Sequence, residues 1–185
     1  IVEFVYGQDH PADRNLIVLT VKHGIGAGIR IHGRLFQGDG GGAGEIGHVV
    51  VQEDGALCRC GNRGCLETIA SAHAVVRRAR ALAGEYPQSP LAQNPAAGLA
   101  EIEAAWRAGD ALAQRVMSDA AQYLGGAIAA LVGVLNIQKI VLTGDLACFG
   151  APWLEQVRAA AARVSLRRLA QQTSLDFGLL DIQAC

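Results

Sequence analysis

Four potential metal ligands lie close together in the sequence, and they restrict the fold more than any other feature of the chain. Three of the five cysteines fall within eight residues, and a histidine lies ten residues before them, which gives the set His48, Cys58, Cys60 and Cys65. Three thiolates and one imidazole are a complete tetrahedral ligand set for zinc. Gly61 and Gly64 would let the loop turn tightly enough to aim the sulfurs inward. Because the protein fills all four positions, the predicted zinc is structural and leaves no position for water.

Two other states of these cysteines stay open at this stage. The thiols could be reduced without a metal, and a single residue between Cys58 and Cys60 is not zinc-finger spacing. A disulfide is a further alternative, although the odd number of cysteines and the lack of a signal-peptide pattern argue against it. Cys148 and Cys185 are isolated in the sequence, and we expect them to be ordinary core or near-terminal residues.

Two carboxylates flank the predicted zinc ligands. Glu45 lies three residues before His48, and Glu67 lies two residues after Cys65. If a metal draws His48 and Cys65 together, both carboxylates approach the same point. Carboxylates accept paired hydrogen bonds from vicinal hydroxyls, and an imidazole can ligate a metal through one nitrogen while the other faces a ligand. Glu45, His48 and Glu67 therefore predict a site for a polyhydroxylated molecule; the alternative is a pair of ordinary surface glutamates.

A glycine-rich turn follows the first predicted strand. Residues 16–22 are rich in β-branched side chains, as in a buried strand, and glycines then alternate at Gly24, Gly26 and Gly28. Such a turn can present backbone amides to a phosphate, so Gly24 and Gly26 are candidate nucleotide-binding residues. The alternative is a tight β-hairpin that needs glycines for its turn alone.

The composition excludes several classes of protein. Hydrophobic residues make up 51% of the 185 residues and charged residues only 18%, which is incompatible with a disordered chain. The formal net charge of −1 argues against a basic nucleic-acid-binding module, because phosphate affinity needs concentrated positive charge. The longest apolar run, residues 124–135, is too short to span a bilayer, so we expect no membrane contact and a cytoplasmic location.

The order of predicted elements indicates an α/β fold, because strands and helices recur along the chain. We expect strands over residues 16–22, 46–51 and 139–143, and helices over residues 68–83, 99–108 and 152–169. A long helix follows Asp110, which caps it, and its apolar C-terminal half is typical of a helix buried between layers. Gly125 and Gly126 would let a neighbour pack closely against that helix. His32 and Gly33 predict a two-residue hairpin turn.

The combined motifs resemble those of one protein family. Residues 44–67 hold Glu-x-Gly-His and then Cys-x-Cys-Gly-x-x-Gly-Cys-x-Glu, which resembles the signature of the ROK family of repressors, open reading frames and sugar kinases. Residues 21–28 resemble the family's phosphate turn, and residues 136–144 resemble the strand that leads to its nucleotide pocket.

The resemblance has consequences for both fold and site. It implies an actin-like ATPase (ribonuclease H-like) fold with a zinc-binding loop. Residues 1–185 would be the C-terminal lobe, truncated at both ends, without the N-terminal lobe or any DNA-binding domain. It also implies that His48, Cys58, Cys60 and Cys65 bind the metal and that Glu45, His48 and Glu67 bind the sugar.

The sequence departs from the kinases of the family at three places. Lys22-His23-Gly24 stands where kinases carry Gly-Thr-Gly, so an imidazole replaces a hydroxyl beside the phosphates. Asp145 follows Gly144 where kinases tend to carry paired glycines, which would bring negative charge near a triphosphate. The family's catalytic aspartate has no counterpart and would lie before Ile1, so no catalytic residue is assigned within the chain.

These features predict the sugar-sensing and oligomerisation domain of a ROK-type transcriptional regulator. We expect structural Zn²⁺, a small-molecule sugar ligand, a homodimer or larger assembly, and DNA contact only through a missing N-terminal domain. The first alternative is an ATP-dependent hexose or amino-hexose kinase, with ATP bound near Gly24 and Gly26. A zinc-stabilised lobe without a ligand is the second.

Overall fold

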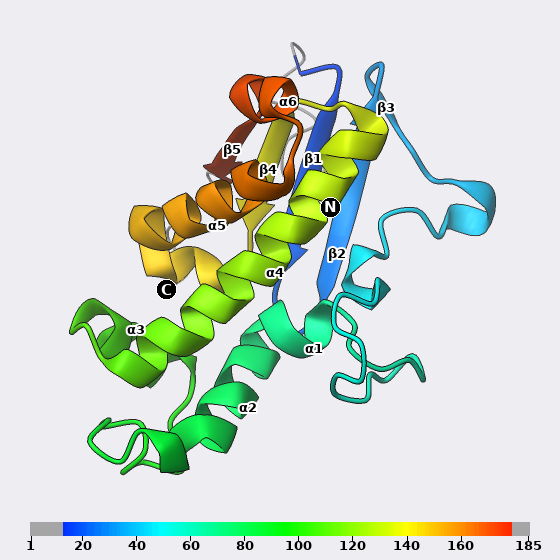
Figure 1. Ribbon diagram of the computed structural model, residues 1–185. Helices are drawn as coiled ribbons and strands as arrows, with labels where there is room; N and C mark the ends of the chain where they lie inside the picture. The colour runs from blue at the N-terminus through cyan, green and yellow to red at the C-terminus, as the bar shows by residue number, and fades with distance from the viewer. Residues whose placement is uncertain (1–12, 179–185) are drawn as a thin grey trace.

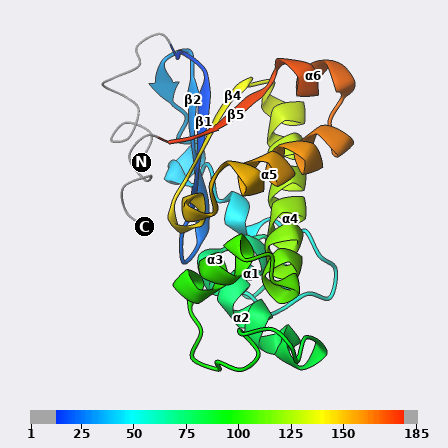
Figure 2. The same cartoon turned by 90° about the vertical axis from the view of Figure 1, so that its left-hand side faces the viewer.

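The computed structural model describes residues 13–178 and shows a mixed five-stranded sheet with the order β3-β2-β1-β4-β5 (Figure 1). The sheet and its helices form separate layers, and Figure 2 shows α4 and α5 on one side of the strands. The strands are β1 (Leu16–Val21), β2 (Ile25–Ile31), β3 (Arg34–Leu35), β4 (Lys139–Thr143) and β5 (Ser174–Phe177). The helices are α1 (Glu67–Ala70), α2 (Ala72–Leu82), α3 (Leu99–Arg107), α4 (Ala111–Leu135), α5 (Gly150–Val164) and α6 (Arg167–Gln172). The expected α/β class is confirmed.

The first three strands form an antiparallel meander. Val21 pairs with Ile25, so β1 and β2 are joined by the three-residue turn 22–24. Gly26 lies within β2 opposite Thr20, which makes the glycine-rich segment a turn followed by a strand rather than a single loop. The second hairpin turns at His32 (φ 52°) and Gly33 (φ 81°), and these two positive φ angles confirm the predicted two-residue turn.

The second half of the sheet is parallel. β4 pairs with β1 and with β5 in the same direction, and α5 and α6 form the connection from β4 to β5. Gly144 ends β4 with a φ of 108°, and a Cβ there would lie 2.2 Å from the Val21 carbonyl oxygen. The ends of β1 and β4 therefore approach closely, next to the β1–β2 turn.

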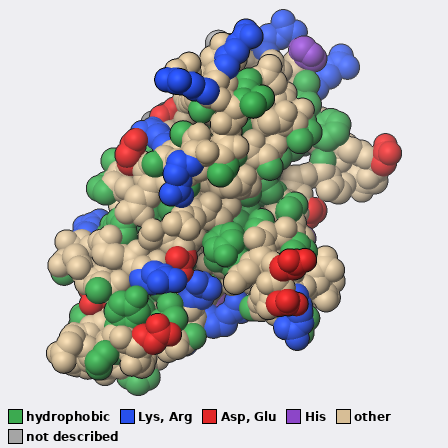
Figure 3. Space-filling model, viewed as in Figure 1, with side chains coloured by type: hydrophobic (Ala, Val, Ile, Leu, Met, Phe, Trp, Pro, Cys, Tyr) green, Lys and Arg blue, Asp and Glu red, His purple; other side chains and the backbone are tan. Residues whose placement is uncertain are grey.

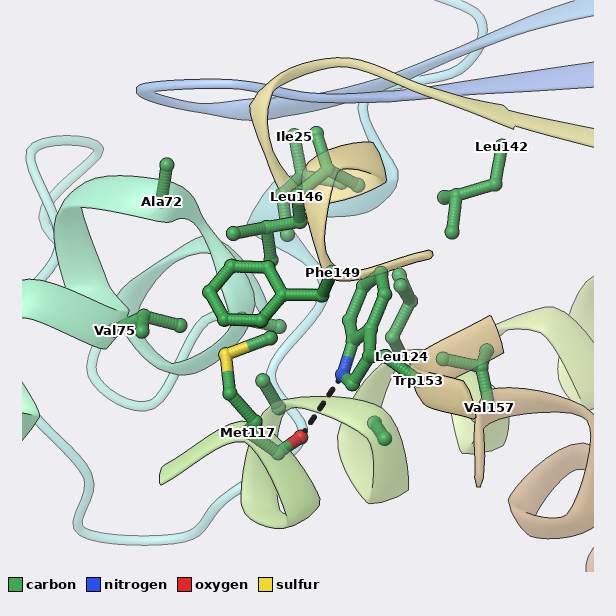
Figure 4. Close-up of a cluster of buried hydrophobic side chains, with 14 of the residues drawn as sticks. Ile25, Ala72, Val75, Met117, Leu124, Leu142, Leu146, Phe149, Trp153 and Val157 are labelled. Carbon is green, nitrogen blue, oxygen red and sulfur yellow. Dashed lines mark hydrogen bonds between the residues drawn. The ribbon is translucent and has the colours of Figure 1, made fainter. Parts of the chain in front are cut away.

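The core lies between the sheet and α4. Trp153 of α5 is fully buried, and its indole Nε1 donates to the carbonyl of Met117 on α4 at 3.0 Å (Figure 4). Phe149 packs against Trp153 at a ring-centroid distance of 6.3 Å. Apolar side chains thus surround the hydrogen-bonded indole N–H of Trp153, and this bond fixes how α5 crosses α4.

Helix α4 is the central helix of the described fold. Asp110 caps it by accepting from the amide of Ala113, as predicted. A Cβ on Gly125 would lie 2.6 Å from Ala160 Cβ of α5, so Gly125 permits the predicted close approach, whereas Gly126 faces open space. The expectation that its C-terminal half is buried between layers is wrong at the end of the helix, because Val134 is 83% exposed. By length and composition α4 could cross a bilayer, but its packing against α5 and the other helices is that of a core helix.

Three predicted elements differ from the structure. Residues 46–51 are not a strand: Ile46–His48 is a short 3₁₀ helix, η3, and only Val50 forms a bridge. The predicted helix 68–83 is interrupted at Ser71, whose backbone is extended and whose side chain caps α2. The predicted helix 152–169 begins earlier, at Gly150, and is divided into α5 and α6 by the extended Ser165.

Candidate functional site

Two glycines hold the η3 segment against β2. The backbone carbonyl of Gly44 accepts a 2.7 Å hydrogen bond from the amide of Ala27. A Cβ on Gly44 would lie 1.8 Å from the Ala27 carbonyl oxygen, and one on Gly47 would lie 2.2 Å from that of Ile25. Only glycine permits this contact. The side chains of η3 are therefore fixed beside the β1–β2 hairpin, and the same contact explains why this segment is not a strand.

The cysteine loop folds back on itself through further glycines. Gly61 (φ 95°) and Gly64 (φ 69°) both lie in the left-handed region. A Cβ on Gly64 would lie 1.7 Å from the carbonyl oxygen of Gln52, so the two arms of the loop touch there. A bridge between Val50 and Cys65 closes the loop onto the end of η3. The tight turn that we expected from these glycines is confirmed.

The loop brings the four predicted metal ligands together. Their ligand atoms all lie within 4.8 Å of one another. Cys58 Sγ lies 3.5 Å from His48 Nδ1, and Cys60 Sγ lies 3.6 Å from Cys65 Sγ. Ligands of a tetrahedral zinc, with metal bonds of about 2.3 Å to sulfur and 2.0–2.1 Å to nitrogen, are roughly 3.5–3.8 Å apart. These three cysteines and one histidine could therefore hold a metal ion, and none of the described cysteines forms a disulfide.

The thiols of the cluster are in different environments. Burial raises the pKa of Cys65 to about 12 and also raises the pKa of Cys58. The backbone near Asn62 lowers the pKa of Cys60, which lies at the exposed side of the cluster. Without a cation the two buried sulfurs are therefore protonated at neutral pH, and a bound metal would have to displace those protons.

Glu67 begins α1 and is nearly buried, with 9% of its side chain exposed. Its Oε1 accepts hydrogen bonds from Cys58 Sγ and Arg59 Nε, each at 3.2 Å, and lies 3.7 Å from His48 Nδ1. Its Oε2 is also buried but has no partner among the described residues. That oxygen lies 3.0 Å from the position where a Cβ on Gly24 would be. Glu67 therefore lies between the candidate metal ligands and the turn of the β1–β2 hairpin.

Glu45 approaches the same histidine from the other side. Its Oε2 lies 3.8 Å from His48 Nε2, while His48 Nδ1 faces Cys58. The Glu45 side chain is 69% exposed, in contrast to Glu67. The structure thus places the three predicted sugar residues next to one another, with one imidazole nitrogen toward the cysteines and the other toward Glu45.

A pocket of about 380 Å³ opens in front of Glu67. The β1–β2 turn, the cysteine loop, α1 and α2 surround it, and its lining residues are His23, Gly24, Leu57, Cys58, Arg59, Glu67, Thr68, Ser71, His73, Ala74 and Arg77. Arg59, His73 and Arg77 are site residues that the sequence pattern did not predict. The four-residue spacing of His73 and Arg77 places them on one face of α2, and this spacing could have indicated from the sequence that the two side chains lie at the same site.

The candidate nucleotide residues belong to the β1–β2 hairpin. Gly24 lies in its turn beside Glu67, and Gly26 lies in β2 with open space around its Cα. Asp145 begins the 3₁₀ helix η5 (Asp145–Phe149) directly after β4. The segment is therefore a β-hairpin, and a nucleotide role for the two glycines stays a prediction.

The isolated cysteines take no part in the cluster. Cys148 is half-buried, and its Sγ donates to the carbonyl of Asp145 at 3.0 Å. Cys185 lies outside the described residues.

The family model of the ROK family matches residues 2–177, which include the hairpin, the cysteine loop and all five strands. The chain belongs to the ROK family. Its relatives include both enzymes and regulators. It is 38% identical over 162 residues to a glucokinase of Halalkalibacterium halodurans, across 85% of this chain and 49% of that protein. It is 37% identical over 146 residues to the N-acetylglucosamine repressor of Escherichia coli O157:H7, across 79% of this chain and 36% of that protein.

A solved structure gives the same relationship. A ROK family transcriptional regulator, a homologue of the Escherichia coli MLC protein, superposes with a TM-score of 0.84 at 33% identity. The match covers 92% of this chain and 43% of that chain. The ROK chain thus spans about half or less of the length of these relatives.

Proposed function

We propose that this ROK chain is the sugar-sensing and oligomerisation domain of a transcriptional regulator. The observation that carries the proposal is the buried Oε2 of Glu67, which has no partner among the described residues and faces Gly24 at the pocket. A buried carboxylate oxygen without a hydrogen bond is costly, and a ligand hydroxyl would satisfy it. The pocket is too small and too polar to favour a large apolar ligand.

We include Glu45 and His48 in the proposed sugar site because His48 lies between the two carboxylates, although neither residue lines the pocket in front of Glu67. A hexose presents neighbouring hydroxyls, each of which can donate to a carboxylate or an imidazole nitrogen. The exposed Glu45 can move toward a ligand, whereas Glu67 is already fixed by Arg59 and Cys58. The relatives named for glucose and N-acetylglucosamine suggest a hexose or N-acetylhexosamine.

We assign structural zinc to His48, Cys58, Cys60 and Cys65. The support is the donor set itself, three sulfurs and one nitrogen within 4.8 Å of one another, which is typical of closed zinc sites, and two of the separations, 3.5 and 3.6 Å, match a tetrahedral zinc. Bound zinc would fix η3 to the cysteine loop and would hold Glu67 and His48 in their present relation. It would supply no reaction, because all four positions are filled by protein.

Sensing is favoured over phosphoryl transfer by the side chains at the end of the sheet. His23 lines the pocket beside Gly24, and Asp145 follows the end of β4 next to the same turn. A carboxylate there would repel a nucleotide triphosphate, whereas a regulator needs the sugar alone. Sugar binding would act on DNA through a further domain, by binding one of two conformations of the protein more tightly.

The kinase alternative is favoured by the similarity to a glucokinase, and the backbone of the β1–β2 hairpin still offers amides near Gly24. It would transfer a phosphoryl group from ATP to a hexose. The catalytic base would have to come from outside this chain.

The test is calorimetric titration of the full-length protein with glucose and with N-acetylglucosamine. Glu67→Gln and Glu45→Gln should each weaken the sugar that binds by about 10- to 150-fold, because each charge-assisted hydrogen bond contributes roughly 1.5–3 kcal/mol. Glu53→Gln, an exposed carboxylate of the same loop outside the pocket, is the matched control and should leave affinity unchanged. Sugar-dependent formation of ADP in a coupled assay would favour the kinase instead.

A further inference from the structure

Cys60 is the accessible member of a pair of cysteines whose sulfur atoms lie close together. Its Sγ is 3.6 Å from Cys65 Sγ, and Cys60 is exposed whereas Cys65 is fully buried. The sulfur–sulfur bond of a disulfide is about 2.05 Å long, so the two atoms need to approach by only about 1.5 Å. One sulfur can therefore meet a dissolved oxidant while its partner lies directly behind it.

The loop around Cys60 can supply that movement. The amide of Cys58 donates to the carbonyl of Asn62 at 2.8 Å, and the amide of Gly61 donates back to the carbonyl of Cys58 at 3.0 Å, which places Cys60 at the tip of a turn. Residues 59–63 are all exposed, and a Cβ on Gly61 would meet open space. Figure 3 shows charged side chains on the surface of this loop, toward the lower right of the view. The tip is therefore open to solvent, and its movement disturbs no part of the hydrophobic core.

Cys65 is held in place at the base of the loop. It forms a bridge with Val50, and its carbonyl accepts from Thr68 Oγ1 at 2.7 Å. Its Sγ donates to the carbonyl of His48 at 3.4 Å. A sulfur in a disulfide has no proton to donate, so oxidation of Cys65 would remove its bond to His48 and loosen η3 against the loop.

Cys58 is less suited to the same reaction. It is buried, and its Sγ donates to Oε1 of Glu67 at 3.2 Å and lies 3.5 Å from His48 Nδ1. Only one residue separates Cys58 from Cys60, so a disulfide between these two would strain the backbone. The geometry therefore favours Cys65 as the partner of Cys60.

We propose that Cys60 and Cys65 form a peroxide-sensitive oxidation site, at which a disulfide replaces two of the proposed zinc ligands. The Cys60 thiolate attacks one oxygen of the peroxide, the O–O bond breaks, and a sulfenic acid and hydroxide form. The hydroxide takes up the proton that the Cys60 thiol has lost. The Cys65 sulfur then attacks the sulfenic sulfur, the S–O bond breaks, and the hydroxyl group leaves as water with the proton of the Cys65 thiol. Two thiols have then lost two electrons to one hydrogen peroxide, which becomes two molecules of water.

This reaction would couple oxidation to the sugar site. The disulfide removes two of the four candidate metal ligands and leaves only His48 and Cys58, so a bound zinc ion would be released. His48 also loses its bond to Cys65, and Glu67 lies two residues after Cys65. The regulator would therefore lose affinity for its sugar under oxidising conditions. This consequence rests on the proposed sugar-sensing function, whereas the disulfide itself does not.

The sequence allows the disulfide to be located directly. Trypsin cleaves after Arg59, Arg63 and Arg77, so the three clustered cysteines fall on three peptides: one that ends at Arg59, then 60–63 and 64–77. The zinc-loaded full-length protein is treated with a modest excess of hydrogen peroxide, digested without reductant and analysed by mass spectrometry. We expect peptides 60–63 and 64–77 to be joined with the loss of two hydrogen atoms. A chromogenic chelator should detect the release of about one zinc ion per chain, and a thiol reductant should reverse both changes.

Variants assign the reaction to this pair. Cys60→Ser should give no cross-link within the loop, whereas Cys58→Ser should still join peptides 60–63 and 64–77. Cys148→Ser removes a thiol outside the cluster, and this matched control should form the cross-link and release zinc as the wild-type protein does. Calorimetry before and after peroxide treatment should show at least a tenfold loss of sugar affinity, which reduction in the presence of zinc restores.

The outcomes separate this inference from the proposed function. A cross-link that includes the peptide ending at Arg59, or oxidation of Cys60 to a sulfinic acid without a cross-link, would show the inference to be wrong. A protein that keeps its zinc and its free thiols through the treatment would do the same. If the disulfide forms and sugar affinity is unchanged, the coupling to the sugar site is wrong. If the reduced protein binds no sugar, the proposed function fails, and the digest still decides the oxidation site.

Discussion

Replacing Cys60 by serine tests the metal site with little disturbance of the fold. Cys60 is the exposed member of the cluster, and its sulfur contributes no volume to the hydrophobic core. In protein without metal, Cys60→Ser should therefore change stability very little. In protein with zinc it removes one of four ligands, so the variant should lose whatever stability the metal supplies.

The size of that loss follows from binding linkage. Zinc present at 1,000 times its dissociation constant stabilises the native state by about 4.1 kcal/mol. For a chain of this size each kcal/mol shifts the melting temperature by about 2–4 °C, so removal of the metal should lower it by about 8–16 °C. The four ligands connect η3, the cysteine loop and the start of α1, so the loss should include local order around Glu67.

Differential scanning calorimetry and elemental analysis measure both effects. The wild-type protein should carry about one zinc per chain by the four-ligand argument, and a strong chelator should lower its melting temperature to that of Cys60→Ser. The chelator should have no further effect on the variant. Cys148→Ser is the matched control, because Cys148 lies outside the cluster, and it should keep its zinc. A native protein without metal, whose thiols all titrate freely, would refute the reasoning.

Three further predictions concern the thiols, the packing of α4 and the nucleotide. After chelation at pH 8, alkylation should modify Cys60 first and Cys65 last, because a pKa of about 12 leaves about one Cys65 thiol in ten thousand ionised. Mass spectrometry of the digested protein measures the order of modification, and a reversed order would contradict this prediction. Gly125→Ala should destabilise the protein by about 1–3 kcal/mol, because the new methyl group would collide with α5, whereas Gly126→Ala should stabilise it by up to about 1 kcal/mol. Denaturant titration measures both free energies of unfolding, and equal effects of the two variants would contradict the close packing of α4 against α5 at Gly125. ATP at millimolar concentration should not raise the melting temperature of the full-length protein, and a clear upward shift would contradict the sensing proposal.

The parts of the site that the sequence predicted are those set by local chemistry. The spacing of the cysteines and of His48 identified a ligand set that the structure brings within 4.8 Å. The hairpin at His32 and the cap at Asp110 were likewise predictable, because a positive φ and an N-cap depend on residue type at a single position.

The parts that were missed depend on contacts between distant segments. Residues 46–51 alternate in a strand-like manner, but Gly44 and Gly47 press that segment against the backbone of β2 and make it a 3₁₀ turn. Ser71 lies inside a continuous helical pattern, yet the chain there turns so that the start of α2 meets the carbonyl of Lys22. Neither contact can be inferred from the periodicity of one segment.

The proposed metal ligands lie in direct contact with Glu67, the proposed sugar-binding carboxylate. Oε1 of Glu67 lies 3.2 Å from Cys58 Sγ and 3.7 Å from His48 Nδ1, two atoms of the proposed metal ligands. Without a cation the buried sulfurs of Cys58 and Cys65 keep their protons, and Cys58 Sγ donates to this carboxylate, whereas bound zinc would displace those protons and fix the three sulfurs and His48 around Glu67. A protein deprived of metal should therefore lose sugar affinity as well as stability. A structural zinc in this family member is thus expected to affect ligand recognition through Glu67, although it would touch no part of the ligand.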